Sequence, residues 1–195
     1  MKKEKSLYDE NGRWVEERGR IKGAIRRAFR LSPQMKEALR AARVELPPKI
    51  NKDGSVGKKN QVRYRCACCS GLFSQKHVQV DHIESVVPLW KSEAEMTYDE
   101  IARGVFCKID NLQVLCSTPK KLNGGKDSCH RLKTNKENYI RNYLLSIDKD
   151  KRIEFISKAE ESYLISVKEK EIKEEQKRLR KEERLKKKLA KTKSV

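Results

Sequence analysis

The chain has 195 residues, enough for one domain with extensions or for two small domains. Only 36% of the residues are hydrophobic and 38% are charged, which indicates that the packed part is shorter than the chain. The net charge of +19 favours a polyanionic partner, with an acidic membrane surface as the competing one. No apolar run of about 18 residues is present, which argues against a transmembrane helix.

The start of the chain, Met1 to Lys5, is basic but is not followed by the apolar stretch of a secretory signal. We therefore expect a cytoplasmic protein that is not secreted. In that compartment the six cysteines are expected to serve as metal ligands rather than to form disulfides.

Residues 11–44 have helical periodicity, and Ser32 followed by Pro33 supplies a cap and a first-turn proline for a second helix. One apolar face contains Ile21, Ala24, Ile25, Ala28 and Phe29. Arg26 and Arg27 lie off this face. They form either a solvated basic surface or an arm along a nucleic-acid backbone, and the two interpretations are compatible.

The remaining elements predict an α+β fold with helices at both ends. Pro47 and Pro48 predict the end of the second helix, and residues 51–60 are expected to form an exposed, flexible, basic loop. Short strands are predicted over 62–66, 78–83 and 112–116. Capping boxes at Thr97 and at Thr134 predict helices over 98–104 and from residue 134 onward. A further helix is predicted over 153–167, followed by a charged, solvated helix from residue 168.

These elements suggest three parts. Residues 1–60 form a basic helical arm and linker, residues 61–147 form the core, and residues 148–195 form a helical, highly charged extension.

The cysteines are spaced as a metal site. Cys66 and Cys69 have the Cys-x-x-Cys spacing that lets one tight turn aim two thiolates at one ion, although Cys68 could replace either of them. Cys116 and Cys129 form a second pair, separated by residues 117–128, which are polar and contain a Gly-Gly. Four thiolates would close a structural Zn²⁺ site with no open position. Cys107 is expected to be a core thiol.

Polar residues in the same segment are candidates for catalysis. His82 can act as a general base, because an imidazole titrates near neutral pH. The Asn111 amide can orient a histidine or brace a loop. Asp81 offers a hard oxygen ligand of the kind that Mg²⁺ or Mn²⁺ prefers, and His130 is placed to bind the same ion. Neighbours on a regular strand point to opposite faces, so Asp81 and His82 can reach one phosphate only if the strand ends or bends there.

The order Cys-x-x-Cys, Val80-Asp81-His82-Ile83, Asn111-Leu112-Gln113-Val114-Leu115-Cys116 and Cys129-His130-x-x-Lys-Thr resembles the HNH endonucleases. The similarity is to the zinc-stabilised, often phage- or mobile-element-encoded members, and it covers roughly residues 62–140.

The resemblance implies a small ββα-metal (His-Me finger) core around one catalytic divalent ion. It implies that His82 activates water, that Asn111 orients His82 or its loop, and that Asp81 and His130 bind the catalytic Mg²⁺, Mn²⁺ or Ni²⁺. It also implies that Cys66, Cys69, Cys116 and Cys129 hold zinc. The longer 117–128 loop departs from the family pattern and offers a basic contact to DNA through Lys120, Lys121 and Lys126.

We therefore expect a metal-dependent endonuclease that cuts DNA, most simply double-stranded DNA, with no membrane partner. Phage packaging or replication proteins are further expected partners, and the oligomeric state is open. The alternative is a non-catalytic, zinc-stabilised nucleic-acid-binding protein, which would not need Asp81, His82, Asn111 and His130 together. A redox or metal-storage protein is a third class, which the spacing and Asn111 argue against.

Overall fold

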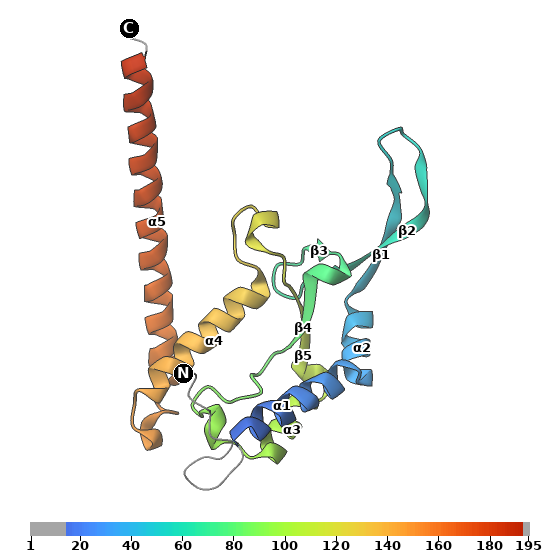
Figure 1. Ribbon diagram of the computed structural model, residues 1–195, viewed down its shortest axis with the longest axis vertical. Helices are drawn as coiled ribbons and strands as arrows, with labels where there is room; N and C mark the ends of the chain where they lie inside the picture. Colours follow the sequence, from blue (N-terminus) through green and yellow to red (C-terminus); the bar gives the residue numbers. More distant parts are fainter. Residues whose placement is uncertain (1–14, 193–195) are drawn as a thin grey trace, which may run out of the picture. The chain divides into compact units, whose positions relative to one another are not determined.

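The computed structural model describes the backbone of residues 15–192 and the side chains of residues 19–186 (Figure 1). Its contacts divide the chain into two compact units, residues 1–137 and residues 138–195. The boundary falls inside helix α4 (Cys129–Leu145). The three-part division drawn from the sequence stays a prediction.

Two helices open the first unit, as predicted. These are α1 (Val15–Arg30) and α2 (Pro33–Ala41). The hydroxyl of Ser32 accepts a hydrogen bond from the Met35 N–H at 3.3 Å, and Pro33 occupies the first turn, where its missing N–H costs nothing. Residues 11–14 of the predicted helical segment lie outside the described residues.

The loop predicted over residues 51–60 is wrong for its second half. Strands β1 (Arg43–Ile50) and β2 (Val56–Arg65) form a long antiparallel hairpin, and only residues 51–55 turn the chain. Pro47 and Pro48 are tolerated because β1 is an edge strand whose register shifts around them. Gly54 closes the turn with φ of +81°, a backbone conformation that suits glycine.

The strands form two small sheets. Strand β3 (Leu72–Phe73) joins β2 in the order β1-β2-β3, while β4 (Val78–His82) pairs with β5 (Leu112–Cys116) in a second, antiparallel sheet. In that second sheet Val78 lies opposite Cys116 and His82 lies opposite Leu112. The three strands predicted from the sequence are thus confirmed, the first of them as part of the longer β2.

A helical excursion separates β4 from β5. Its helix α3 (Tyr98–Val105) begins with the predicted capping box, in which Thr97 and Glu100 each accept a hydrogen bond from the other's backbone N–H, at 3.1 and 2.8 Å. Ile101 and Val105 of α3 are buried with Phe29 and Leu112 in the main hydrophobic core. The segment between β4 and β5 therefore packs against α1 through α3 before the chain re-enters the sheet as β5.

The helix predicted to start at Thr134 starts earlier. Helix α4 runs from Cys129 to Leu145, and the hydroxyl of the buried Ser128 accepts a hydrogen bond from the Arg131 N–H at 3.4 Å. Thr134 instead donates its hydroxyl proton to the carbonyl of His130 at 2.9 Å. The prediction failed because the capping pattern at Thr134 lies one turn inside a helix that Ser128 already caps.

In the second unit, α5 (Ile156–Thr192) confirms the predicted helices over 153–167 and from 168 onward as one helix with a later start. The Tyr139 hydroxyl lies 2.9 Å from the Ser162 hydroxyl, and the rings of Tyr139 and Tyr163 meet edge to face. None of the described helices is long and apolar enough to cross a membrane.

The described residues also contain short 3-10 turns, which are η1 (Gln75–His77), η2 (Glu93–Glu95), η3 (Ile109–Asn111), η4 (Lys120–Leu122) and η5 (Lys149–Lys151).

Candidate functional site

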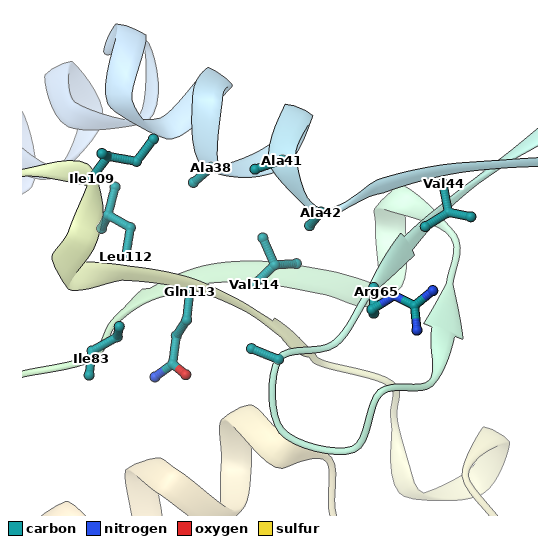
Figure 2. A pocket seen from close by; sticks show the side chains of 11 residues that line it. Ala38, Ala41, Ala42, Val44, Arg65, Ile83, Ile109, Leu112, Gln113 and Val114 are labelled. Atoms are coloured by element: carbon teal, nitrogen blue, oxygen red, sulfur yellow. The ribbon is translucent and has the colours of Figure 1, made fainter.

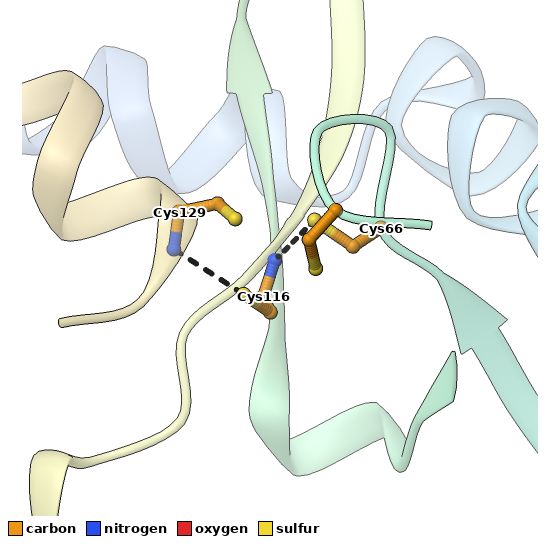
Figure 3. Close-up of side chains that lie close together, drawn as sticks. Cys66, Cys116 and Cys129 are labelled. Atoms are coloured by element: carbon orange, nitrogen blue, oxygen red, sulfur yellow. Dashed lines mark hydrogen bonds between the residues drawn. The ribbon is translucent and has the colours of Figure 1, made fainter. Parts of the chain in front are cut away.

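Four cysteine side chains meet where β2, β5 and α4 come together. The sulfur atoms of Cys66, Cys69, Cys116 and Cys129 all lie within 4.8 Å of one another. Figure 3 shows Cys66, Cys116 and Cys129 converging from three separate segments. Among the residues that the structure describes, this is the only group of three or more His, Cys, Asp or Glu side chains whose ligand atoms could hold one metal ion.

The first cysteine pair is presented by a tight turn after β2. The Ser70 N–H donates to the Cys66 carbonyl at 3.0 Å, and the Cys66 N–H donates to the Gly71 carbonyl at 2.9 Å. Ser70 adopts the left-handed conformation with φ of 57°. A Cβ on Gly71 would lie 2.8 Å from the Phe73 ring, so the close return of the chain depends on this glycine.

The second pair is brought together by a loop that folds on itself. The Cys129 N–H donates to the Cys116 sulfur at 3.2 Å, which joins the two ends of the 117–128 loop. Inside the loop, Lys120 pairs with Asp127 at 3.0 Å, and the Asn123 amide donates to the Lys126 carbonyl at 3.1 Å. The long spacing in the sequence therefore does not separate the two sulfurs.

Backbone donors favour thiolate character at Cys66. Burial raises the pKa of this thiol, but hydrogen bonds from backbone N–H groups, with those of Cys69 and Cys116 foremost, outweigh it and lower the pKa to about 7. Burial raises the pKa of Cys116, and burial together with hydrogen bonds among the neighbouring thiols raises the pKa of Cys129. Four thiolates so close together need a cation to stabilise their charge.

The two remaining cysteines lie outside this group. Cys68 is exposed and is not one of the four that share a site, although its thiol lies within hydrogen-bonding reach of Cys129. Cys107 is partly buried against the main hydrophobic core, and burial raises its pKa. A core thiol is what the sequence predicted at Cys107.

His82 ends β4 with its ring directed at the helices of the core. Its Nε2 lies 3.0 Å from the Val105 carbonyl of α3, and its ring stacks on Phe29 of α1 with centroids 5.3 Å apart. A carbonyl oxygen can only accept, so this contact requires a proton on Nε2, and in the neutral imidazole Nδ1 then carries the lone pair.

Asn111 braces the chain immediately after His82. Its side-chain oxygen accepts a hydrogen bond from the Glu84 N–H at 2.7 Å, and its backbone carbonyl accepts from the Ile83 N–H at 2.9 Å. Both bonds tie the start of β5 to the end of β4. Of the two roles expected for Asn111, bracing a loop is the one that these contacts describe.

Asp81 points toward α4 and meets a lysine there. The Lys133 ammonium lies 3.0 Å from Asp81, 2.7 Å from the His82 carbonyl and 2.5 Å from Glu137. Although burial opposes its charge, hydrogen bonds to Glu137 and Asp81 raise the pKa of Lys133. Sequence reasoning missed Lys133 although it belongs to the sequence motif, and the signal for its role is its spacing of four residues from Glu137.

His130 shares a helix face with Lys133. It lies in the first turn of α4, directly after Cys129, and is half-buried. Residues three apart on a helix are neighbours, so His130 lies one turn before the lysine that contacts Asp81. The structure thus directs Asp81 to α4, while the His82 ring contacts α1 and α3, and it does not bring these two neighbouring side chains to one face.

Among the basic residues predicted to contact DNA, Arg26, Arg27, Lys121 and Lys126 are exposed. Lys120 is exposed as well, but its ammonium pairs with Asp127.

A separate pocket of about 470 Å³ lies between α2 and β5 (Figure 2). Its walls are mainly apolar, with Ala38, Leu112 and Val114 among them, and Arg65 is the charged residue in its lining. None of the predicted catalytic side chains lines it. The predicted catalytic side chains therefore lie outside this pocket, near the end of β4 and the start of α4.

Comparison of the chain with models of protein families, with curated proteins and with solved structures finds no match.

Proposed function

We propose that this chain is a metal-dependent endonuclease of the HNH type, which hydrolyses DNA phosphodiester bonds on a core held together by zinc. The observation that carries the proposal is the junction of β4, β5 and α4. There the four-cysteine cluster adjoins the helix face of His130, and Lys133 on that face reaches Asp81. Two antiparallel strands followed by a helix are also the arrangement that the resemblance to HNH endonucleases implies.

The cysteine cluster fits zinc. A tetrahedral ion with zinc–sulfur bonds of about 2.3 Å requires sulfurs about 3.8 Å apart, and the four sulfurs already lie within 4.8 Å of one another. Two of them also accept backbone N–H hydrogen bonds, which stabilise metal-bound thiolates. Four protein ligands leave no open position, so this zinc is structural.

Each of the four candidate catalytic residues would have a separate role. Asp81 and His130 would hold a divalent ion such as Mg²⁺, Mn²⁺ or Ni²⁺, which supplies charge stabilisation at the phosphate. His82, with its Nε2 proton held by the Val105 carbonyl, offers Nδ1 to take a proton from water. Asn111 keeps the chain after His82 in place through its bonds to Ile83 and Glu84.

A second candidate function is supported by a specific contact. The Lys133 ammonium already neutralises Asp81, and the His82 ring faces the core helices rather than α4. Both features suit a zinc-stabilised DNA-binding protein without catalysis. A nuclease requires that a divalent ion compete with Lys133 for the Asp81 carboxylate.

A plasmid-nicking assay with Mg²⁺, Mn²⁺ and Ni²⁺ distinguishes an endonuclease from a DNA-binding protein without catalysis. We expect metal-dependent cleavage that falls by about 10²–10⁴-fold in His82→Ala, because a positioned general base contributes that much. His77→Ala is the matched control, since His77 lies in η1 away from these contacts and should leave cleavage unchanged. Unimpaired cleavage by His82→Ala would refute the mechanism. DNA binding without cleavage under any of the three metals would favour the binding protein.

A further inference from the structure

The outer half of the β1–β2 hairpin is an ordered ribbon exposed to solvent. Residues 49–60, called here the hairpin tip, are all exposed except the half-buried Gly57. The turn is held by the Asn51 N–H donating to the Ser55 carbonyl at 2.8 Å and by the Asn51 side chain donating to the Ser55 hydroxyl at 2.9 Å. Figure 1 shows the paired strands extending away from α2.

The hairpin tip is positively charged. It presents Lys49, Lys52, Lys58 and Lys59, and none of the four forms an ion pair within the part of the chain that the structure describes. Asp53 is the single acidic residue of the tip, and its carboxylate already accepts hydrogen bonds from the backbone and hydroxyl of Ser55. The lysines are therefore uncompensated by neighbours and free to meet phosphates.

Two apolar side chains complete the surface. Ile50 and Val56 pair across the strands and are 68% and 67% exposed. No core explains them, because the hairpin tip has no layer packed over it in the described part of the chain. An apolar pair between lysines matches a DNA groove, where sugars and thymine methyl groups lie between two rows of phosphates.

We propose that the hairpin tip is a binding ribbon for double-stranded DNA, with its four lysines on the phosphates and the Ile50–Val56 pair directed into the groove. Two strands about 4.8 Å apart form a ribbon that the major groove, about 12 Å wide, admits. The inference deepens the proposed function and rests on it for the choice of DNA as the polyanion. An anionic lipid surface is disfavoured because membrane-surface elements present a broad apolar face, whereas the tip offers two side chains.

The salt dependence of DNA binding tests this assignment. The variant Lys49→Gln/Lys52→Gln/Lys58→Gln/Lys59→Gln removes the tip charge. The control Lys170→Gln/Lys173→Gln/Lys177→Gln/Lys181→Gln removes the same charge from exposed positions on α5. Anisotropy of a labelled duplex of about 30 base pairs, without added divalent ion, measures affinity between about 50 and 200 mM salt. Circular dichroism and zinc content verify that both variants are folded.

Each phosphate contact contributes about 0.9 to the slope of log affinity against log salt. The wild type should therefore lose roughly 100-fold more affinity over this salt range than the tip variant, and Lys52→Gln alone should lower the slope by about one. The α5 control should keep the wild-type slope.

An unchanged slope in the tip variant, or an equal change in the α5 control, would overturn the proposal. So would lysine-dependent binding to phosphatidylserine vesicles combined with an unchanged DNA slope. The two proposals fail separately. If the wild type binds DNA through the tip but does not cleave it with any of the three metals, only the endonuclease proposal is refuted. If the wild type cleaves DNA and the tip variant binds DNA normally, only the ribbon proposal is refuted.

Discussion

Lys133 connects α4 to β4 through the Asp81 carboxylate and the His82 carbonyl, and it also pairs with Glu137 within α4. Its side chain is 21% exposed, and that of Asp81 is 23% exposed, so both charges are partly removed from water. Charges in such positions depend on each other, because the one left behind after a substitution cannot be fully hydrated.

We expect Lys133→Ala to lower the free energy of unfolding by about 1–3 kcal/mol, since it leaves the Asp81 and Glu137 carboxylates facing each other without a cation. Urea denaturation measures the change. Lys121→Ala is the matched control, because Lys121 is exposed and forms no ion pair with the described residues. A destabilisation of equal size in both variants would contradict this role for Lys133.

For single residues, the sequence predicted metal ligands that are close together in the chain better than it predicted contacts between distant residues. The turn from Cys66 to Cys69 is local, so its spacing alone indicated two ligands of one site. The contact between Asp81 and Lys133 joins residues more than fifty positions apart, and only the packing of α4 against β4 creates it. The orientation of the His82 ring likewise depends on Phe29, which a local motif does not include.

At the scale of elements, the cysteine cluster links the turn after β2, the end of β5 and the start of α4. We expect Cys116→Ser and Cys129→Ser each to lose bound zinc and to weaken the folding of the first unit, because three remaining ligands bind less tightly than four. Zinc per chain, measured by mass spectrometry of the purified protein, tests this. Cys68→Ser is the control and should keep its zinc, and normal zinc in both ligand variants would refute the shared site.

The elements that sequence reasoning missed were those with competing local signals. Two prolines and a polar stretch resemble a linker, yet β1 accommodates Pro47 and Pro48 through register shifts at the edge of a sheet. Thr134 and Glu137 match a capping box, yet Glu137 pairs with Lys133 inside a helix already capped at Ser128. In the first place strand pairing overrode the local signal, and in the second an earlier cap had already started the helix.

At the scale of the whole molecule, the outer part of α5 contributes little to packing. Every described side chain from Lys168 onward is exposed, whereas Ala159 nearer the start of α5 is fully buried. The helix there is supported by its own backbone bonds and by ion pairs such as Arg178 with Glu175.

We expect a chain ending after Val167 to keep its zinc content and its urea midpoint, since no buried apolar area is removed. A chain ending after Lys151 is the control and should lose stability, because it also removes Ala159 and the partners of Tyr139. Both are followed by urea denaturation. A large drop in the midpoint of the longer chain would show that outer α5 does stabilise the fold.

The loop between Cys116 and Cys129 bears on how such clusters are identified in other genomes. Its ends meet at the Cys129 N–H and the Cys116 sulfur, while its middle turns through Gly124 and Gly125, both with positive φ. The twelve residues between these two ligands therefore do not keep them apart. A search pattern that demands a fixed number of residues between the third and fourth cysteines would overlook this arrangement, so their closure in space is the better criterion.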